Sequence, residues 1–161
     1  MATIELKRFR KIGPGFYNLK VPFYCRQYLK GMIDIGTHMS LVKIESTGKF
    51  LVLDVCSLDS VARSEFDFLT NNGLLIDSVI ATHPFHTTYF ESFYKTYPTL
   101  KYYGTPRHIR KLTTISWTGD ISNEDNLRLW EPEVLTTLIL ILDYCQLEFF
   151  TQKLTSIFFN F

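Results

Sequence analysis

The chain has 161 residues, of which 46% are hydrophobic and 16% aromatic, and its formal net charge is +1. This length and composition predict one folded domain with a substantial core, and they exclude an intrinsically disordered chain. A charge so close to zero gives no general attraction to nucleic acid, so no nucleic-acid partner is expected.

The first fifty residues nevertheless carry an excess of Lys and Arg over Asp and Glu. Such a region either forms a solvated face or meets anionic lipid or RNA, and no aromatic-interleaved recognition motif supports RNA. The basic segment Met1–Pro14 lacks the apolar core of a secretory signal. The three cysteines show no C-x-x-C spacing, which argues against a disulfide framework and favours a reducing, cytoplasmic location.

The N-terminal half predicts mainly antiparallel strands. Phe16–Val21 follows a Gly-Pro-Gly turn and alternates like an edge strand, and Ile33–Ile35 is a short apolar piece closed by Gly36. Met39–Glu45 and Phe50–Val55 predict a β-hairpin. Because its second strand is apolar on both faces, we expect that strand to be central and covered.

The pattern then changes to alternating helices and strands. Apolar residues recur at helical spacing after Ser57 or Asp59, either of which can cap the helix, and Asn72-Gly73 supplies its stop. The apolar stripe consists of Leu58, Val61, Ala62, Phe66 and Leu69.

Two further strand–helix pairs follow. Leu75–Ala81 predicts a strand, and Thr88 and Glu91 fit a capping box that opens a helix. Leu100–Tyr103 predicts another strand, followed by a helix that opens at Thr105-Pro106. The whole order predicts an α/β (α+β) fold with a mixed sheet covered by helices.

The character of the chain changes near its C-terminus, which suggests a domain over residues 1–134 and an atypical apolar tail over residues 135–161. The longest aliphatic run, Val134–Leu142, is too short to span a bilayer. If this tail replaces a further half-domain, apolar surface is left for an oligomer or a partner protein to cover.

Chemistry is suggested at the end of the Leu75–Ala81 strand by His83 and His86. Two imidazoles at this spacing can bind one zinc ion if further ligands are supplied, and they can equally be hydrogen-bonded or solvated. The candidate donors elsewhere are Asp34, His38, Asp54, Asp59 and His108.

Two smaller constellations allow an alternative chemistry. Asp34 and His38 lie either side of a turn, as an acid/base pair or as a turn-stabilising carboxylate beside a surface histidine. Cys56 precedes a helix start, where a thiolate is favoured, although an apolar core position explains it equally.

The hairpin strand ending at Asp54, the strand ending in Thr82-His83 and the later Tyr103–Pro106 together resemble the metallo-β-lactamase superfamily. The resemblance covers residues 16–111, about the first half of such a fold, and so implies an incomplete αββα half. Asp54 matches the aspartate that follows the family's strand, and Thr82-His83 matches the opening of its metal motif.

The family's motif, His-x-His-x-Asp-His, is largely absent from this chain. In register from His83, the chain has Phe85, Thr87 and Thr88 in place of the second histidine, the aspartate and the last histidine, and His86 is one position out of register. The resemblance therefore implies a divergent, non-catalytic relative that serves as a binding or structural module.

Two alternatives remain open. One is a mononuclear metal-dependent hydrolase of esters or lactones, with zinc on His83, His86 and Asp54 and bound water as the nucleophile. The other is a peripheral membrane-associated module that uses the basic N-terminal region and the apolar tail.

Overall fold

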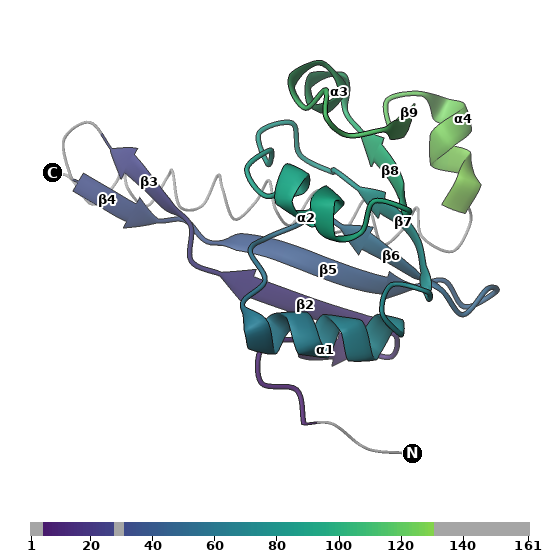
Figure 1. Ribbon diagram of the computed structural model, residues 1–161, viewed down its shortest axis with the longest axis horizontal. Helices are drawn as coiled ribbons and strands as arrows, with labels where there is room; N and C mark the ends of the chain where they lie inside the picture. Colours follow the sequence, from purple (N-terminus) through teal and green to yellow (C-terminus); the bar gives the residue numbers. More distant parts are fainter. Residues whose placement is uncertain (1–4, 28–30, 131–161) are drawn as a thin grey trace, which may run out of the picture.

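The computed structural model describes residues 5–27 and 31–130. Its main feature is a mixed seven-stranded sheet with the strand order β1-β2-β5-β6-β7-β8-β9, to which α1 and α2 add a helical layer (Figure 1). The strands of this sheet are β1 (Arg10–Gly13), β2 (Phe16–Val21), β5 (Thr37–Lys43), β6 (Phe50–Leu53), β7 (Ile76–Ile80), β8 (Lys101–Gly104) and β9 (Trp117–Asp120). The predicted mixed sheet covered by helices is thus confirmed.

The strand Phe16–Val21 is present, but its prediction as an edge strand is wrong. β2 lies between β1 and β5, with antiparallel partners on both sides. The strand at this edge of the sheet is β1. Its residues, Arg-Lys-Ile-Gly, are largely exposed and show no apolar alternation. The Gly-Pro-Gly turn therefore closes a β1–β2 hairpin instead of preceding the first strand.

The predicted central hairpin is confirmed. β5 and β6 are antiparallel, and β6 is the middle strand of the seven. All four residues of β6 are buried. A strand that is apolar on both faces is stable only when both faces are covered, which places β6 at the centre of the fold.

From β6 onward the strands are parallel, and helices connect them. The connecting helices are α1 (Ser60–Thr70), α2 (Phe90–Thr96) and α3 (Pro106–Lys111), and β9 is followed by α4 (Glu124–Leu127) and the 3-10 helix η1 (Arg128–Trp130). α1 and α2 pack Phe66, Phe90 and Phe93 into the core formed with one face of the sheet.

The ends of α1 follow from local chemistry. Asp59 caps its start by accepting a hydrogen bond from the Ala62 backbone, and the left-handed Asn71 ends it. The predicted stripe is only partly buried, because Val61 is 41% exposed, while the unpredicted Glu65 is buried. The Glu65 carboxylate accepts hydrogen bonds from the backbone of residues 7–9.

The capping box predicted for Thr88 and Glu91 is wrong. The N-cap of α2 is Tyr89, which makes no capping hydrogen bond through its side chain. Glu91 instead accepts a hydrogen bond from the Thr114 hydroxyl at 2.7 Å. The Tyr89 backbone is already helical, so the hydrogen bonds of a capping box are not formed there.

A separate two-stranded arm is formed by β3 (Tyr24–Gln27) and β4 (Gly31–Asp34), which extends beyond the main sheet (Figure 1). Its chain leaves through Gly36, whose positive φ of 66° suits glycine. Within the described ranges, no helix is long and apolar enough to cross a membrane. The predicted boundary at residues 134–135 and the tail lie outside the described residues.

Candidate functional site

Asp54, Thr82 and the two loop histidines meet at one end of the sheet. Asp54 directly follows β6, and Thr82–His86 follows β7. β6 and β7 are parallel, with Leu53 opposite Ile80, so the loops after both strands emerge at the same edge. This edge of a parallel sheet is where ligand sites are commonly built.

Asp54 has an unusual backbone conformation. Its φ is +52°, in the left-handed region that few residues other than glycine adopt. Its N–H donates to the Ile80 carbonyl at 2.8 Å, so the turn is fixed against β7. This turn brings the carboxylate to face the loop that follows β7.

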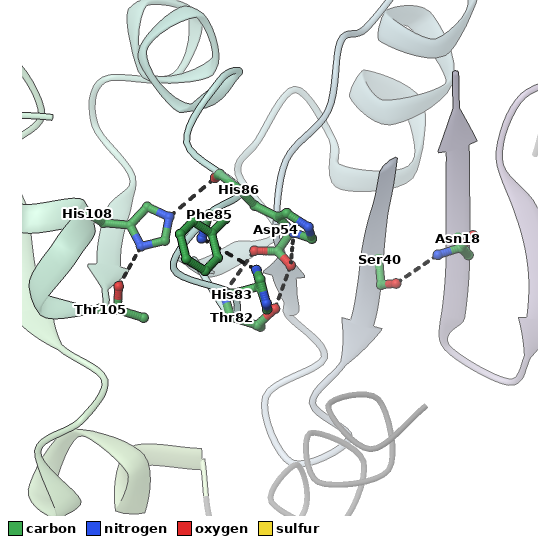
Figure 2. Close-up of polar contacts among 9 residues, drawn as sticks. All are labelled: Asn18, Ser40, Asp54, Thr82, His83, Phe85, His86, Thr105 and His108. Carbon is green, nitrogen blue, oxygen red and sulfur yellow. Dashed lines mark hydrogen bonds and ion pairs between the residues drawn. The ribbon is translucent and has the colours of Figure 1, made fainter. Parts of the chain in front are cut away.

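The Asp54 carboxylate is engaged at both oxygens (Figure 2). Oδ1 accepts the Thr82 backbone N–H at 2.9 Å. Oδ2 accepts the Thr82 hydroxyl at 2.5 Å and lies 3.2 Å from His86 Nδ1. Because a carboxylate only accepts, Nδ1 of His86 carries the proton in this contact. Asp54 therefore holds the loop after β7 at two positions, Thr82 and His86.

The two loop histidines lie side by side, with ring centroids 4.8 Å apart. The hydrogen bond to Asp54 raises the pKa of His86, partly opposed by burial. Burial lowers the pKa of His83, and the neighbouring His86 lowers it further. The two shifts have opposite directions. His86 therefore favours the charged form, and His83 favours the neutral form.

His108 supports this loop from α3, a role that the sequence did not indicate. The ring is fully buried, with Nδ1 2.8 Å from the Thr105 hydroxyl and Nε2 3.3 Å from the His86 carbonyl. Burial lowers the pKa of His108, which favours a neutral ring. Since a carbonyl only accepts, Nε2 donates and Nδ1 accepts from Thr105 (Figure 2).

The remaining candidates serve local structure elsewhere. Asp34 accepts hydrogen bonds from the Phe23 and Gly36 backbones, which lower its pKa. Asp59 caps α1 and pairs with Arg8 at 2.7 Å. His38 Nδ1 lies 3.2 Å from the side-chain oxygen of Asn18. These residues therefore do not join the site after β7.

Cys56 is a core residue. Its thiol is buried, and burial raises its pKa to about 12. A thiol held neutral in this way is a poor nucleophile at physiological pH. The reading of Cys56 as part of the core is therefore the one that the geometry favours.

The residues present do not fit a zinc ion as they are arranged. Of the predicted ligands, Asp54 and His86 are bonded to each other, and the other two contacts of the Asp54 carboxylate are with the backbone N–H and the hydroxyl of Thr82. In the described part of the chain, no three His, Cys, Asp or Glu side chains are grouped so that they could hold a metal ion. A zinc site needs three or four such donors turned toward one point.

Solved structures similar to this chain are metallo-β-lactamases. DIM-1 metallo-β-lactamase is 15% identical with a TM-score of 0.47, and the match covers 73% of this chain and 53% of that chain. VMB-1 is 22% identical with a TM-score of 0.47, covering 76% and 54%. The metallo-β-lactamase from Hirschia baltica is 15% identical with a TM-score of 0.46, covering 71% and 51%.

The chain thus spans about half the length of these solved structures. The matches name the same superfamily as the sequence resemblance, and they concern the fold alone. Identities and TM-scores this low carry no conclusion about metal, substrate or reaction. No family model and no curated protein matches the chain.

Proposed function

We propose that this chain is a non-hydrolytic metallo-β-lactamase-like module, in which the residues near the metal-motif position hold a loop in place. The observation that carries the proposal is the engagement of Asp54 by Thr82 and His86. A carboxylate that accepts from three internal donors holds the loop in place. With Nδ1 of His86 bonded to Asp54, this ring could reach an ion only through Nε2, and the described residues bring no group of three His, Cys, Asp or Glu side chains together to hold one.

The same loop presents features suited to a partner protein. Phe85 lies at its tip, 68% exposed, and the Arg107 guanidinium lies 4.9 Å from the centre of its ring. Aromatic and arginine side chains are enriched where proteins bind one another. Held rigid by Asp54 and His108, the loop would offer this pair without a large ordering cost. A binding role therefore agrees with a structural role for the network.

The proposal is tested by hydrolysis of nitrophenyl esters and lactones by the full chain, with and without added zinc. We expect no zinc-dependent turnover above that of the His83→Ala variant. The His83 side chain accepts a long contact from the Phe85 backbone at 3.4 Å, and the hydrogen bond from the His86 N–H goes to the His83 carbonyl, which alanine keeps. The substitution should therefore leave the fold intact. Zinc-dependent turnover that disappears in His83→Ala would contradict the proposal.

The second candidate is the mononuclear hydrolase. It is favoured by the placement of two imidazole rings 4.8 Å apart beside a carboxylate. It requires at least one further ligand beside Nε2 of His86 and the His83 ring, since the described residues group no three donors there. The turnover assay separates the two candidates, since only the hydrolase predicts activity that depends on both zinc and His83.

A further inference from the structure

The short helix α3 presents a positively charged face beside the loop after β7. Arg107, Arg110 and Lys111 are all exposed on this helix. Because they are three and four residues apart, their side chains leave the helix on one face. We call the surface made of Phe85, Arg107, Arg110 and Lys111 the α3 surface.

Two contacts join this helix face to the loop. Lys111 Nζ donates to the Thr87 hydroxyl at 2.9 Å. The Arg107 guanidinium lies 4.9 Å from the centre of the Phe85 ring, which is 68% exposed. The same ring lies 5.6 Å from the ring of His83. An exposed aromatic side chain is therefore held directly beside a group of cations.

The charges of the α3 surface are not neutralised by carboxylates of the described residues. Within residues 5–27 and 31–130, no Asp or Glu forms an ion pair with Arg107, Arg110 or Lys111. Like charges at this helical spacing repel one another. Arg107 also lies in the first turn of α3, where the helix dipole disfavours a cation. A bound group of negative charge would remove this repulsion.

We propose that the α3 surface binds an acidic segment of a partner protein, with carboxylates on the three cations and an apolar side chain on Phe85. The planar guanidinium matches a carboxylate in shape and charge, and an arginine beside an aromatic ring is typical of binding hot spots. A nucleic acid fits less well, because its affinity rests on many phosphate contacts and the net charge of +1 gives no wider attraction. The inference rests on the binding role proposed for this loop and specifies the chemistry of the partner.

The direct test is an NMR titration of the isotope-labelled full chain with the peptide Asp-Glu-Leu-Asp-Glu, blocked at both ends. The matched control peptide is Asn-Gln-Leu-Asn-Gln, which has the same length and no charge. We expect saturable amide shifts at residues 82–87 and 105–112, with a Kd below about 1 mM for the acidic peptide, and weaker binding as salt is raised. The absence of saturable shifts, or equal binding of the neutral peptide, would overturn the proposal.

A matched pair of charge variants tests the location of the site. Arg107→Gln with Arg110→Gln removes two charges from the α3 surface, and Lys95→Gln with Lys101→Gln removes two charges from exposed positions elsewhere. We expect the first variant to bind the acidic peptide at least about tenfold more weakly and the control to change by less than about twofold. Equal weakening in both would show a general attraction of charge and would overturn the proposal.

The contribution of the aromatic ring is tested in the same way. Phe85→Ala should weaken binding severalfold, whereas Leu74→Ala, at a position that is 72% exposed, should leave it unchanged. Tighter binding of an oligouridylate than of the acidic peptide at the same residues would overturn the proposal in favour of a nucleic acid. Absent peptide binding overturns this inference alone, and zinc-dependent turnover in the ester and lactone assay overturns the proposed function, so the two failures are distinguishable.

Discussion

Asp54 links the local conformation of one residue to the architecture of the site. Its left-handed backbone is a conformation of higher energy that persists only where surrounding contacts fix it. Those contacts are the Ile80 carbonyl at its N–H and the two donors of Thr82 at its carboxylate. The energy of the strained turn is thus offset by hydrogen bonds to the neighbouring strand and its loop.

Replacing Asp54 by Asn tests this arrangement through its dependence on pH. Hydrogen bonding to Asp54 raises the folded-state pKa of His86 above its usual value of 6.5. The stabilisation from the charged pair is therefore fully present below pH 6.5 and is lost as the pH rises through the higher folded pKa. We expect Asp54→Asn to be less stable than the wild type, with a larger deficit at pH 5.5 than at pH 9.

The measurement is denaturant unfolding of both proteins at the two pH values. Burial lowers the pKa of His83 and of His108, and the charge of Asp54 partly offsets this for both. Its replacement therefore lowers these two pKa values further, which adds to the deficit at pH 5.5. Asp125→Asn, at an exposed position, is the control and should change stability by less than about 0.5 kcal/mol. A deficit that is equal at both pH values would show that the ion pair contributes nothing.

Part of the site could be predicted at the level of single residues. Asp54, His83 and His86 are the candidate ligands of the mononuclear alternative, and the structure places all three at one edge of the sheet. The roles of Thr82 and His108 were not evident. These roles depend on the register between β6, β7 and β8. That register brings the Thr82 hydroxyl to the Asp54 carboxylate and Nε2 of His108 to the His86 carbonyl.

At the scale of elements, Glu65 fixes the N-terminal segment to α1. It is 3% exposed and accepts hydrogen bonds from the backbone N–H groups of Lys7, Arg8 and Phe9. This role of Glu65 could not be predicted, because a glutamate inside an amphipathic helix normally faces solvent. Its burial is explained only by donors that lie 56 to 58 residues away.

Glu65→Gln is expected to destabilise the protein by about 1–3 kcal/mol. The amide keeps one accepting oxygen but turns an NH₂ group toward backbone donors, leaving at least one of them unsatisfied. Denaturant unfolding measures the loss, and faster hydrogen exchange at residues 7–9 would locate it. Glu124→Gln, at an exposed position, is the control. Equal stability of the two variants would contradict a structural role for Glu65.

Sequence patterns are sufficient to predict some of the helices and strands but not others. The β5–β6 hairpin and the alternation from β6 to α3 followed directly from apolar periodicity and turn residues. The capping box failed because Thr114, distant in sequence, binds Glu91. The edge strand was misplaced because β1 is short and polar, so only its pairing with β2 reveals it.

At the scale of the whole molecule, the sheet separates two apolar faces with different covers. One face packs on α1 and α2, and the other carries a buried cluster that includes Leu51, Ile80 and Trp130. The mixed sheet itself was predictable from the order of elements. The cover of its second face could not be predicted. A strand that is apolar on both sides indicates that both faces of the sheet are covered, but it does not show which segments cover them.

The strand-end edge joins the ends of β6 and β7 to α3. There Asp54 and His86 connect the two loops, and His108 of α3 donates to the His86 carbonyl, so that the three residues form one hydrogen-bonded unit. We therefore predict that this edge holds no metal ion.

The most direct test of this central claim is zinc content, measured by elemental mass spectrometry on the full chain purified without a metal-binding tag. We predict that zinc is far below one ion per chain and that a variant carrying His83→Ala and His86→Ala holds the same trace amount. A stoichiometry of about one zinc per chain that is lost in the variant would contradict the account.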